Sequence, residues 1–392
     1  MTAAASGGRL RIAFMGAGRR MAGVYLPVAR ALGDFLEPVG FASRDKAKGE
    51  AAAAEMGLPW FPDLPGLVEG ARPDLIALCV PPAANAGLAL QAIARKVAVL
   101  METPVSPSLS EARALARAAA AAKAVVGVAE QKPFLPLEQL KRKVIEAGAL
   151  GRVSVAHNAF RSYDYHAIAQ LRAYLRGDAC VRVRCLSRSA PLRGKPGPDG
   201  APGRPRLEKW DFATVETASG ALLVHEFSDA YKSSAFRIGP GLKVFGETGT
   251  LADGELAFQG SDGVTHTVRV EGYEAGAPRA PRRLSFALEG IDAAWDNPFA
   301  DHALADDQVG LACHFAAMRD AVLAGSPPLY GLRDAIADLE IVAAMRLSSR
   351  LGGCAVNLPL SLPREAAAIA FTPALWGRVL GAILRRGAKA RG

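Results

Sequence analysis

Residues 10–21 read LRIAFMGAGRRM, in which the apolar segment Leu10–Met15 runs directly into the turn Gly16-Ala17-Gly18. The first glycine of such a turn permits a tight bend. The second lets the backbone approach a phosphate group at the N-terminus of the following helix. Met21 stands where this pattern has Gly or Ala, which predicts slightly looser packing of helix on strand, relieved by Gly23. The stretch therefore predicts the first strand, phosphate-binding turn and helix of a dinucleotide-binding domain.

The end of the second predicted strand indicates which dinucleotide is bound. It reads Phe41-Ala42-Ser43-Arg44 and lacks the acidic residue that usually accepts hydrogen bonds from the ribose of NAD. Ser43 and Arg44 instead suit a 2′-phosphate, because a guanidinium can form paired charged hydrogen bonds with it. We therefore predict that NADP(H) is preferred over NAD(H). If Arg44 is only a solvated side chain, Arg19 or Arg20 of the turn would hold the phosphate.

Short apolar strands alternate with helical patterns through the first 130 residues. This alternation predicts a parallel sheet covered by helices on both faces. The helical segments are rich in alanine, which has the highest helix propensity, as in EARALARAAAAAKA at 111–124. We therefore assign residues 1–130 to an α/β Rossmann domain. Its predicted strands are Leu10–Met15, Pro38–Ala42, Asp74–Val80, Ala98–Glu102 and Val125–Ala129.

The pattern changes after Glu130, and residues 131–372 are predicted to form an α+β domain for substrate binding and oligomerisation. Alternating segments between 181 and 270, separated by glycine-containing turns, predict a largely antiparallel open sheet with one face free to meet a partner. The other predicted elements are helices at Leu137–Ala147, His166–Leu175, Leu311–Leu323 and Leu332–Leu351, and a strand at Val153–Phe160.

Two segments have a biased composition. Residues 194–205 read GKPGPDGAPGRP, four Gly-X-Y triplets, which are too few for a triple helix and predict a mobile insertion loop. Residues 373–392 form a basic tail, predicted as a short amphipathic helix that packs on the body, with contact to a membrane surface as the alternative.

Composition excludes several other classes of protein. The chain has 392 residues, 50% of them hydrophobic, which suffices for two cored domains. Its formal charge of +9 comes from scattered basic residues, so we expect no nucleic-acid partner. No run approaches the roughly 18 apolar residues of a membrane helix, and no signal peptide is visible, which predicts a cytoplasmic protein. The five cysteines form no CxxC pair and the histidines do not cluster, so no metal site is predicted.

With these features together, the chain resembles the glucose-fructose oxidoreductase and inositol dehydrogenase family (Gfo/Idh/MocA). The likeness covers roughly residues 9–355. Its landmarks are the GAGRRM turn, Val80-Pro81-Pro82, Met101-Glu102-Thr103-Pro104, Gly148-Ala149-Leu150-Gly151-Arg152-Val153, and the glycine-turn hairpin Val244–Leu251. The resemblance implies that Val80, Pro81, Asn85 and Glu102-Thr103-Pro104 line the cofactor site, with the peptide before Pro104 often cis. It also implies a homodimer or homotetramer.

The chain departs from the family at positions that matter for catalysis. Family members typically have Glu-Lys-Pro where this sequence has Thr103 in the lysine position. They have an Asp four residues before a catalytic His, and the matching residues here are Ser162 and His166. Asn85 stands where a histidine is common. Of the expected lysine, aspartate and histidine, only the histidine is present.

Three interpretations of these departures are open. In the first, the protein is an oxidoreductase in which His166 is the general acid or base, since its unperturbed pKa lies near working pH, and Tyr163, Asp164 or Tyr165 supplies support. In the second, it uses bound nicotinamide without net redox change. In the third, it has kept the fold as a binding or regulatory protein. A core histidine, and Asp164 as a helix N-cap, are the structural alternatives.

The function we expect is an NADP(H)-dependent oxidoreductase that acts on a carbonyl, hydroxyl or imine of a small polar molecule such as a sugar or cyclitol derivative. The substrate would lie on the sheet of the second domain, beside the carboxyl ends of the Rossmann strands. Because the segment from Val153 to His166 is short, one substrate-covering loop of the family is missing, and the 194–205 segment would compensate for it.

Overall fold

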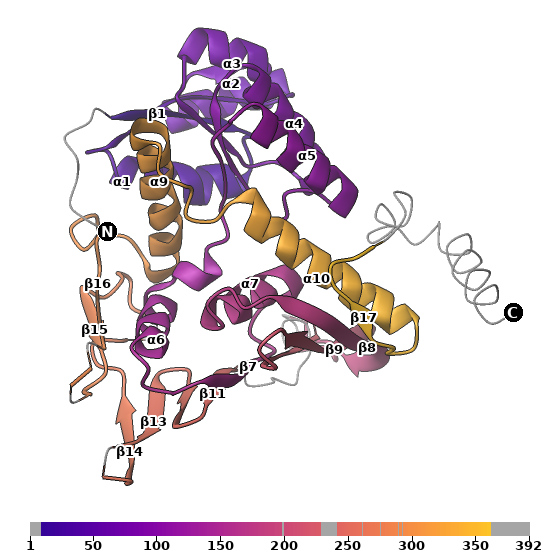
Figure 1. Ribbon diagram of the computed structural model, residues 1–392. Coiled ribbons are helices and arrows are strands. Elements are labelled where there is room, and N and C mark those ends of the chain that lie inside the picture. Colours follow the sequence, from indigo (N-terminus) through magenta and orange to yellow (C-terminus); the bar gives the residue numbers. More distant parts are fainter. Residues whose placement is uncertain are drawn as a thin grey trace, which may run out of the picture.

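A computed structural model describes residues 9–361, except 198–199, 229–240, 261, 275, 289 and 292. The chain forms a Rossmann domain and a second domain built on a large sheet, with helices between them (Figure 1). The two predicted fold classes are confirmed. The predicted basic tail, 373–392, lies outside the described residues.

The Rossmann sheet has six parallel strands in the order β3-β2-β1-β4-β5-β6. This is the doubly wound order whose direction of progression reverses between β1 and β4, where such sheets bind ligands. Strands β4 and β5 are buried at every residue, as expected for strands covered on both faces. The strands are β1 Leu10–Met15, β2 Leu36–Ala42, β3 Trp60–Phe61, β4 Leu75–Leu78, β5 Ala98–Met101 and β6 Val126–Val128.

Three helices of this domain, α2, α3 and α5, begin at residues whose side chains satisfy a free backbone N–H group. The side chains of Asp45, Asp63 and Ser108 accept these bonds. The two-residue strand β3 was not predicted, because it is too short to show an alternating pattern. The helices are η1 Met21–Tyr25 continuing into α1 Leu26–Ala31, α2 Lys46–Met56, α3 Leu64–Ala71, α4 Pro82–Ala94 and α5 Leu109–Ala121.

The second domain contains a sheet of nine strands, in the order β14-β13-β12-β11-β7-β10-β9-β8-β17. All described neighbours in it are antiparallel except β7 and β10. Buried Val183 and Cys185 alternate with exposed Arg182 and Arg184, so one face is covered and the other is open. The strands are β7 Val153–Ala159, β8 Cys180–Arg193, β9 Pro205–Thr217, β10 Leu222–Ser228, β11 Gly241–Gly246, β12 Gly249–Ala252, β13 Glu255–Gln259, β14 Thr265–Arg269 and β17 Val356–Asn357.

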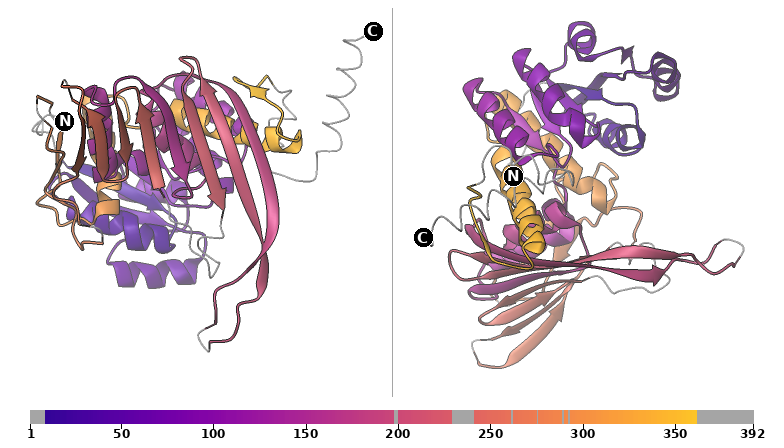
Figure 2. Two further views of the ribbon diagram at one scale, coloured as in Figure 1. Left: turned by 90° about the horizontal axis from the view of Figure 1, so that it is seen from below. Right: turned by 90° about the vertical axis from the view of Figure 1, so that its right-hand side faces the viewer.

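The segment predicted as an insertion loop is the tip of a long hairpin. Strands β8 and β9 pair without interruption up to Arg193 and Pro205, and the amide of Gly194 donates to the carbonyl of Arg204 at 3.1 Å. The hairpin projects past the other strands (Figure 2). The two flanking strands belong to the antiparallel sheet predicted over 181–270, although their pairing as one long hairpin was not predicted.

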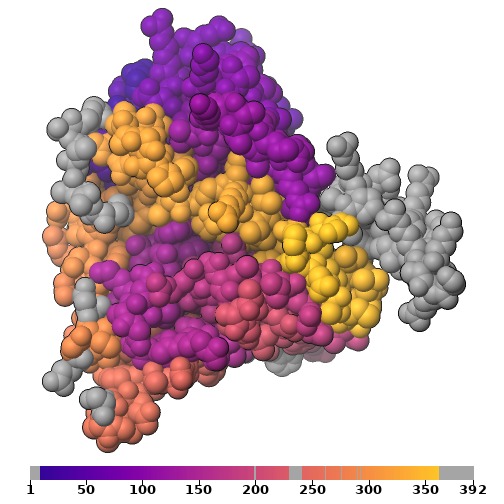
Figure 3. Space-filling model, viewed as in Figure 1, coloured from indigo at the N-terminus to yellow at the C-terminus, as the bar shows by residue number. Residues whose placement is uncertain are grey.

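Helices from both ends of the second domain lie between the two sheets. Figure 3 shows the orange and yellow C-terminal region between the indigo Rossmann domain and the magenta sheet domain. Helices α9 and α10 contact α1, α5 and β6, and α10 also packs on α7 and β8. The remaining elements are η2 Lys132–Phe134, α6 Pro136–Glu146, α7 Asp164–Tyr174, β15 Arg283–Ser285, β16 Ala294–Asp296, α9 Asp306–Ala324 and α10 Leu332–Arg350.

The last Rossmann strand is joined to the second domain through its backbone. The amide of Val128 donates to the carbonyl of Tyr330 at 2.8 Å, and Gly127 forms an isolated bridge with Gly331. A Cβ on Gly127 would lie 2.5 Å from the sulfur of Met318, so a larger residue there would displace this side chain. In the described ranges, no helix is long and apolar enough to cross a membrane, and no group of acidic, His and Cys residues could hold a metal ion.

Candidate functional site

The glycine turn after β1 has the geometry that the sequence predicted. Gly16 has φ +105°, and a Cβ there would lie 2.5 Å from the carbonyl oxygen of Cys79, at the end of β4. Only glycine fits this position. A Cβ on Gly18 would meet nothing within 4 Å, so open space lies in front of its backbone. The turn therefore leaves room for a ligand at the point where the sheet reverses direction.

Met21 is accommodated by a change in the helix rather than by looser packing. Its side chain is fully buried, and the helix starts with a π-helical turn, Met21–Tyr25, before the α-helical part begins. A π-helical turn is wider than an α-helical one, so it makes room for the Met21 side chain where the motif has Gly or Ala. Such π-helical turns are frequent at functional sites. Gly23 is exposed and touches no neighbour, so the prediction that it relieves crowding was wrong.

The two arginines of the turn differ in their surroundings. Arg19 is exposed. Arg20 donates from Nε to the carboxylate of Glu102 and lies over the ring of Tyr25, 5.4 Å from its centroid. Burial lowers the pKa of Arg20, but the charge of Glu102, its hydrogen bond and the neighbouring Tyr25 and Cys79 together raise this pKa above its usual value. Arg20 thus connects the glycine turn to the end of β5. Arg19, which is exposed, is the better placed of the two to contact an anion.

The residues predicted to select NADP(H) lie at the end of β2. Ser43 Oγ accepts a hydrogen bond from Trp60 Nε1 at 3.0 Å, which leaves the hydroxyl proton available for another acceptor. Arg44 is exposed and has no hydrogen bond or ion pair with any described residue. Both side chains are therefore available to a ligand on this edge of the sheet.

Asn85 supports the segment after β5 and does not face open space. It is fully buried on α4, and its Nδ2 donates to the carbonyls of Glu102 at 2.9 Å and Pro104 at 3.1 Å. The Thr103–Pro104 peptide is cis, as the resemblance implied. Val80 lies against Gly16, and Pro81 is the N-cap of α4. Val80 and Asn85 thus connect the glycine turn and the segment after β5 to the end of β4 and the start of α4.

His166 forms a pair with a carboxylate that the sequence did not single out. Its Nδ1 lies 2.6 Å from Oε2 of Glu130, whose side chain is 2% exposed, while that of His166 is 20% exposed. The other carboxylate oxygen, Oε1, accepts the amide of Lys132 at 3.1 Å, and the carbonyl of Glu130 accepts His314 Nε2 at 2.8 Å. Glu130 is thus fixed on both sides, and it orients the imidazole so that Nε2 is the nitrogen left for chemistry.

One signal in the sequence could have found Glu130. It follows β6 directly and is the only acidic residue in the stretch GVAEQKPF. The carboxyl ends of parallel strands meet at one edge of the sheet, the edge already predicted to bind the ligand. Its partner is 36 residues away, so no local spacing connects the two.

Tyr165 joins this pair to the end of β5. It lines a small cavity together with Thr103, Pro104 and Glu130, and its ring lies 4.4 Å from that of His166. Burial and the charges of Glu130 and Glu102 raise the pKa of Tyr165 to about 12, against a hydrogen bond with Thr103 that lowers it. Tyr165 is therefore a phenol at neutral pH, able to donate a hydrogen bond.

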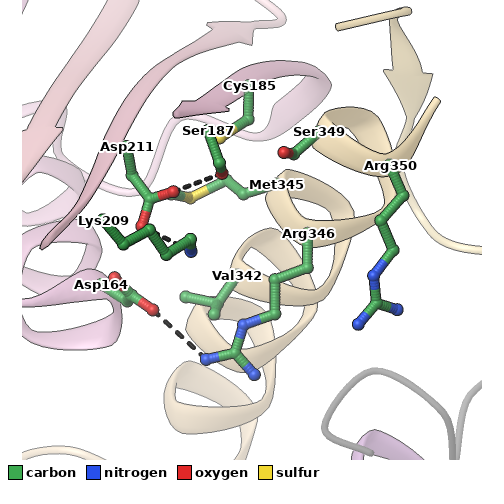
Figure 4. Close-up of a pocket in the computed structure, with 10 residues that line it drawn as sticks. All are labelled: Asp164, Cys185, Ser187, Lys209, Asp211, Val342, Met345, Arg346, Ser349 and Arg350. Atoms are coloured by element: carbon green, nitrogen blue, oxygen red, sulfur yellow. Dashed lines mark hydrogen bonds and ion pairs between the residues drawn. The ribbon is translucent and has the colours of Figure 1, made fainter. Parts of the chain in front are cut away.

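Asp164 has partners other than His166. Tyr163, not Asp164, is the N-cap of α7, so the N-cap alternative for Asp164 was wrong. Burial alone would raise the pKa of Asp164, but His225, whose Nε2 lies 3.9 Å from Oδ1, and the charge of Arg346 (Figure 4) hold the pKa of this carboxyl well below its usual range. Asp164 is therefore ionised and committed to these partners.

A cavity of about 430 Å³ opens beside α7 on the covered face of the sheet. It is large enough for a small polar molecule. His166 lies in ring contact with two of its lining residues, Tyr163 at 6.2 Å and Tyr165 at 4.4 Å. The lining comprises Tyr163, Asp164, Tyr165, Lys209, Asp211 and Phe227.

The structure thus brings most of the predicted site residues together. The turn at 16–21 and the segment 102–104 are connected through Arg20, and the segment meets Tyr165 and His166 through Glu130. Ser43 and Arg44 stand apart at the end of β2, where the far end of an extended ligand would lie.

Comparisons with known proteins agree with this geometry. Residues 10–130 match the model of the oxidoreductase family with an NAD-binding Rossmann fold, Gfo/Idh/MocA. The chain is 31% identical over 155 residues to inositol 2-dehydrogenase 4 of Saccharopolyspora erythraea, a match that covers 39% of this chain and 46% of that protein. The chain therefore aligns with about half the length of this curated relative.

Solved structures share the fold of nearly the whole chain. An oxidoreductase from Agrobacterium radiobacter, solved with NAD⁺, L-tartaric acid and magnesium, superimposes with a TM-score of 0.66 at 17% identity, over 89% of this chain and 98% of that one. Levoglucosan dehydrogenase, solved with NADH and levoglucosan, gives a TM-score of 0.66 at 16% identity, over 90% of this chain and 100% of that one. The match over residues 10–130 and the shared fold of both domains thus make this chain similar to oxidoreductases of the Gfo/Idh/MocA family with an NAD-binding Rossmann fold.

Proposed function

We propose that this protein is a nicotinamide-dependent oxidoreductase that moves a hydride to or from a carbonyl, hydroxyl or imine carbon of a small polar, sugar-like molecule. The observation that supports it most directly is the buried pair of Glu130 and His166. This pair lies at the carboxyl edge of the Rossmann sheet, close to the glycine turn and to a cavity of substrate size.

The residues of the turn fit a dinucleotide. The bend at Gly16 leaves no room for a side chain, Gly18 faces open space, and a helix begins directly after them. Together these features make a cradle for a pyrophosphate. When bound, the cofactor would supply the hydride chemistry, and the protein supplies orientation and proton transfer.

His166 would move the proton that accompanies the hydride. The carboxylate of Glu130 holds the tautomer in which Nδ1 carries hydrogen, so Nε2 can take a proton from a substrate hydroxyl. The same carboxylate stabilises the imidazolium that results, as in other His–carboxylate pairs. The phenol of Tyr165 and the hydroxyl of Thr103 offer hydrogen bonds to a substrate oxygen, in place of the lysine charge that the family usually provides.

We further propose that NADP(H) is the preferred cofactor. The exposed guanidinium of Arg44 and the free proton of the Ser43 hydroxyl support this preference, because both can bind a 2′-phosphate. The solved relatives named above carry NAD⁺ and NADH, so the preference would be a property of this chain's own β2 end. Assembly through the open sheet face into a dimer or tetramer, and a cytoplasmic location, belong to the same proposal.

Fluorescence titrations of the purified protein with NADPH and NADH test the cofactor assignment. We expect saturable binding of both, with the lower dissociation constant for NADPH. A lower constant for NADH would refute the NADP(H) preference. Absence of binding by either would refute the cofactor assignment and favour a binding or regulatory role.

Substitution of the imidazole tests the catalytic assignment. His166→Asn should lower kcat by about 10²–10⁴ at unchanged cofactor affinity, the range that a positioned proton donor contributes. His157→Asn is a matched control, because His157 also faces a carboxylate, that of Glu226 at 3.6 Å, away from this site. Unchanged turnover in His166→Asn would remove this residue from the mechanism.

A further inference from the structure

The small cavity beside Tyr165 and Glu130 is lined by a second carboxyl group, that of Asp338 on α10. The cavity measures about 10 Å³, which is space for about one water molecule and far too little for a substrate. The groups around it therefore act on one another. None of the roles described above uses Asp338.

Asp338 is joined to the helix that carries His166. Arg172, in the last turn of α7, donates from Nη1 to Oδ1 of Asp338 and to the carbonyl of Asp334, the latter at 3.3 Å. The side chain of Arg172 is 19% exposed and that of Asp338 is 5% exposed. Breaking a buried ion pair leaves an uncompensated charge, so this contact fixes α7 against α10.

Asp338 is also joined to the strand that leads to Glu130. The hydroxyl of Tyr330 donates to its other oxygen, Oδ2. The carbonyl of Tyr330 in turn accepts the amide of Val128, two residues before Glu130, at 2.8 Å. Asp338 thus uses one oxygen toward each of the two elements that carry the Glu130–His166 pair.

Charged and titratable groups face Asp338 from several elements. Burial raises the pKa of Asp338 to about 7, against the charge and hydrogen bond of Arg172 and the hydrogen bond of Tyr330, which lower it. The charge of Glu130 raises the pKa further. Cys180 on β8 is a neutral thiol, because burial raises its pKa to about 11. Since electrostatic interactions are mutual, the charge of Asp338 also acts on Glu130 and on the imidazole that Glu130 holds.

We propose that Asp338 is a positioning residue for the Glu130–His166 pair: it connects the two elements that carry the pair, and its negative charge favours the protonated form of His166. This assignment rests on the proposed function, in which His166 moves the proton. In this role Asp338 touches neither substrate nor cofactor. It governs how readily Nε2 of His166 takes up a proton.

NMR titration of the His166 imidazole, in full-length protein with isotope-labelled histidine, measures this effect without requiring turnover. The chain has six histidines, and His166→Asn identifies the signal by its loss. Asp338→Asn removes the charge and keeps a polar group of the same size between Arg172 and Tyr330. Asp334→Asn is the matched control, because Asp334 also faces Arg172, at 3.9 Å on the same helix, but is 46% exposed and lies outside the cavity lining. Thermal unfolding establishes that each variant is folded.

We expect the midpoint of the His166 titration to fall by about one pH unit in Asp338→Asn and to stay unchanged in Asp334→Asn. The midpoint falls because the imidazolium loses a stabilising negative charge. If Asp338→Asn does not fold, since it leaves the charge of Arg172 buried without a partner, Tyr330→Phe serves instead. Tyr330→Phe removes a hydrogen bond that favours the charged carboxylate, so it should lower the midpoint in the same direction by a smaller amount.

An unchanged midpoint in folded Asp338→Asn, or an equal fall in Asp334→Asn, would overturn the proposal. Binding of NADPH and NADH is measured separately on the same proteins. If neither dinucleotide binds while the midpoint still depends on Asp338, the proposed function fails and the coupling of Asp338 to the pair stands. If a dinucleotide binds and the midpoint does not move, the role of Asp338 fails and the cofactor assignment stands.

Discussion

Replacing Gly18 with alanine should weaken dinucleotide binding without lowering the free energy of unfolding. Gly18 is not in the left-handed backbone region, and its new Cβ would contact no protein atom within 4 Å. Alanine restricts the unfolded chain, so the free energy of unfolding should rise by about 0.4–1 kcal/mol. The methyl group would nevertheless occupy the space in which a pyrophosphate approaches the backbone. Losing one charged hydrogen bond costs about 1.5–3 kcal/mol, so the dissociation constants for NADPH and NADH should rise about ten- to a hundredfold.

Gly16→Ala provides the contrast. At φ +105° alanine is strained by on the order of 1–3 kcal/mol, and its Cβ would collide with the carbonyl of Cys79. We therefore expect lower stability as well as lost binding. Urea unfolding and fluorescence titration on both variants measure the two quantities. Wild-type affinity for both dinucleotides in folded Gly18→Ala protein would refute the placement of the pyrophosphate at this turn.

Three further outcomes are expected. Glu130→Gln should lower kcat about ten- to a hundredfold, because an amide stabilises an imidazolium less than a carboxylate does. The control Glu226→Gln should leave kcat unchanged. Equal kcat in the wild type and Glu130→Gln would exclude the Glu130–His166 pair from proton transfer. Arg44→Ala should weaken NADPH binding about ten- to a hundredfold and leave NADH binding unchanged, and equal losses would argue against a 2′-phosphate contact. Burial lowers the pKa of His314 to about 4 from 6.5. Between these pH values the unfolded chain therefore binds more protons than the folded chain. The free energy of unfolding should fall by on the order of 3 kcal/mol as the pH drops through this window. His314→Gln should flatten this dependence in urea unfolding and exposed His266→Gln should not; a pH-independent wild type would contradict the assignment.

Local patterns were enough to predict the Rossmann domain. Strand β1 was predicted with its observed bounds, and β4 and β5 to within two residues, because parallel strands covered on both faces are continuous apolar runs. The helix after β5, Leu109–Ala121, lies close to the predicted alanine-rich segment 111–124, because such segments need little tertiary support. Two features were not predicted: strand β3, which has only two residues, and the pairing of β8 with β9 as one long hairpin.

The site was predicted less completely, for a physical reason. Positions defined by backbone requirements, such as Gly16, can be read from a motif, because no other residue tolerates their geometry. The pairing of Glu130 with His166 depends on how α7 packs against the end of β6, and Asp164 turned out to face α10 rather than the cap of its own helix. Contacts of this kind are set by packing between elements, which a single sequence does not display.

The backbone hydrogen bond between Val128 and Tyr330 affects whether the Rossmann domain can be separated from the rest of the chain. A terminal strand normally offers unpaired N–H and C=O groups on which other chains can assemble, and β6 is shielded here by residues 330–331, two hundred positions further along the chain. A fragment that ends at residue 130 would expose this edge together with the apolar surfaces now covered by α9 and α10. Such a fragment should self-associate even though it contains every strand of its sheet, so the nucleotide-binding unit is unsuited to transplantation on its own.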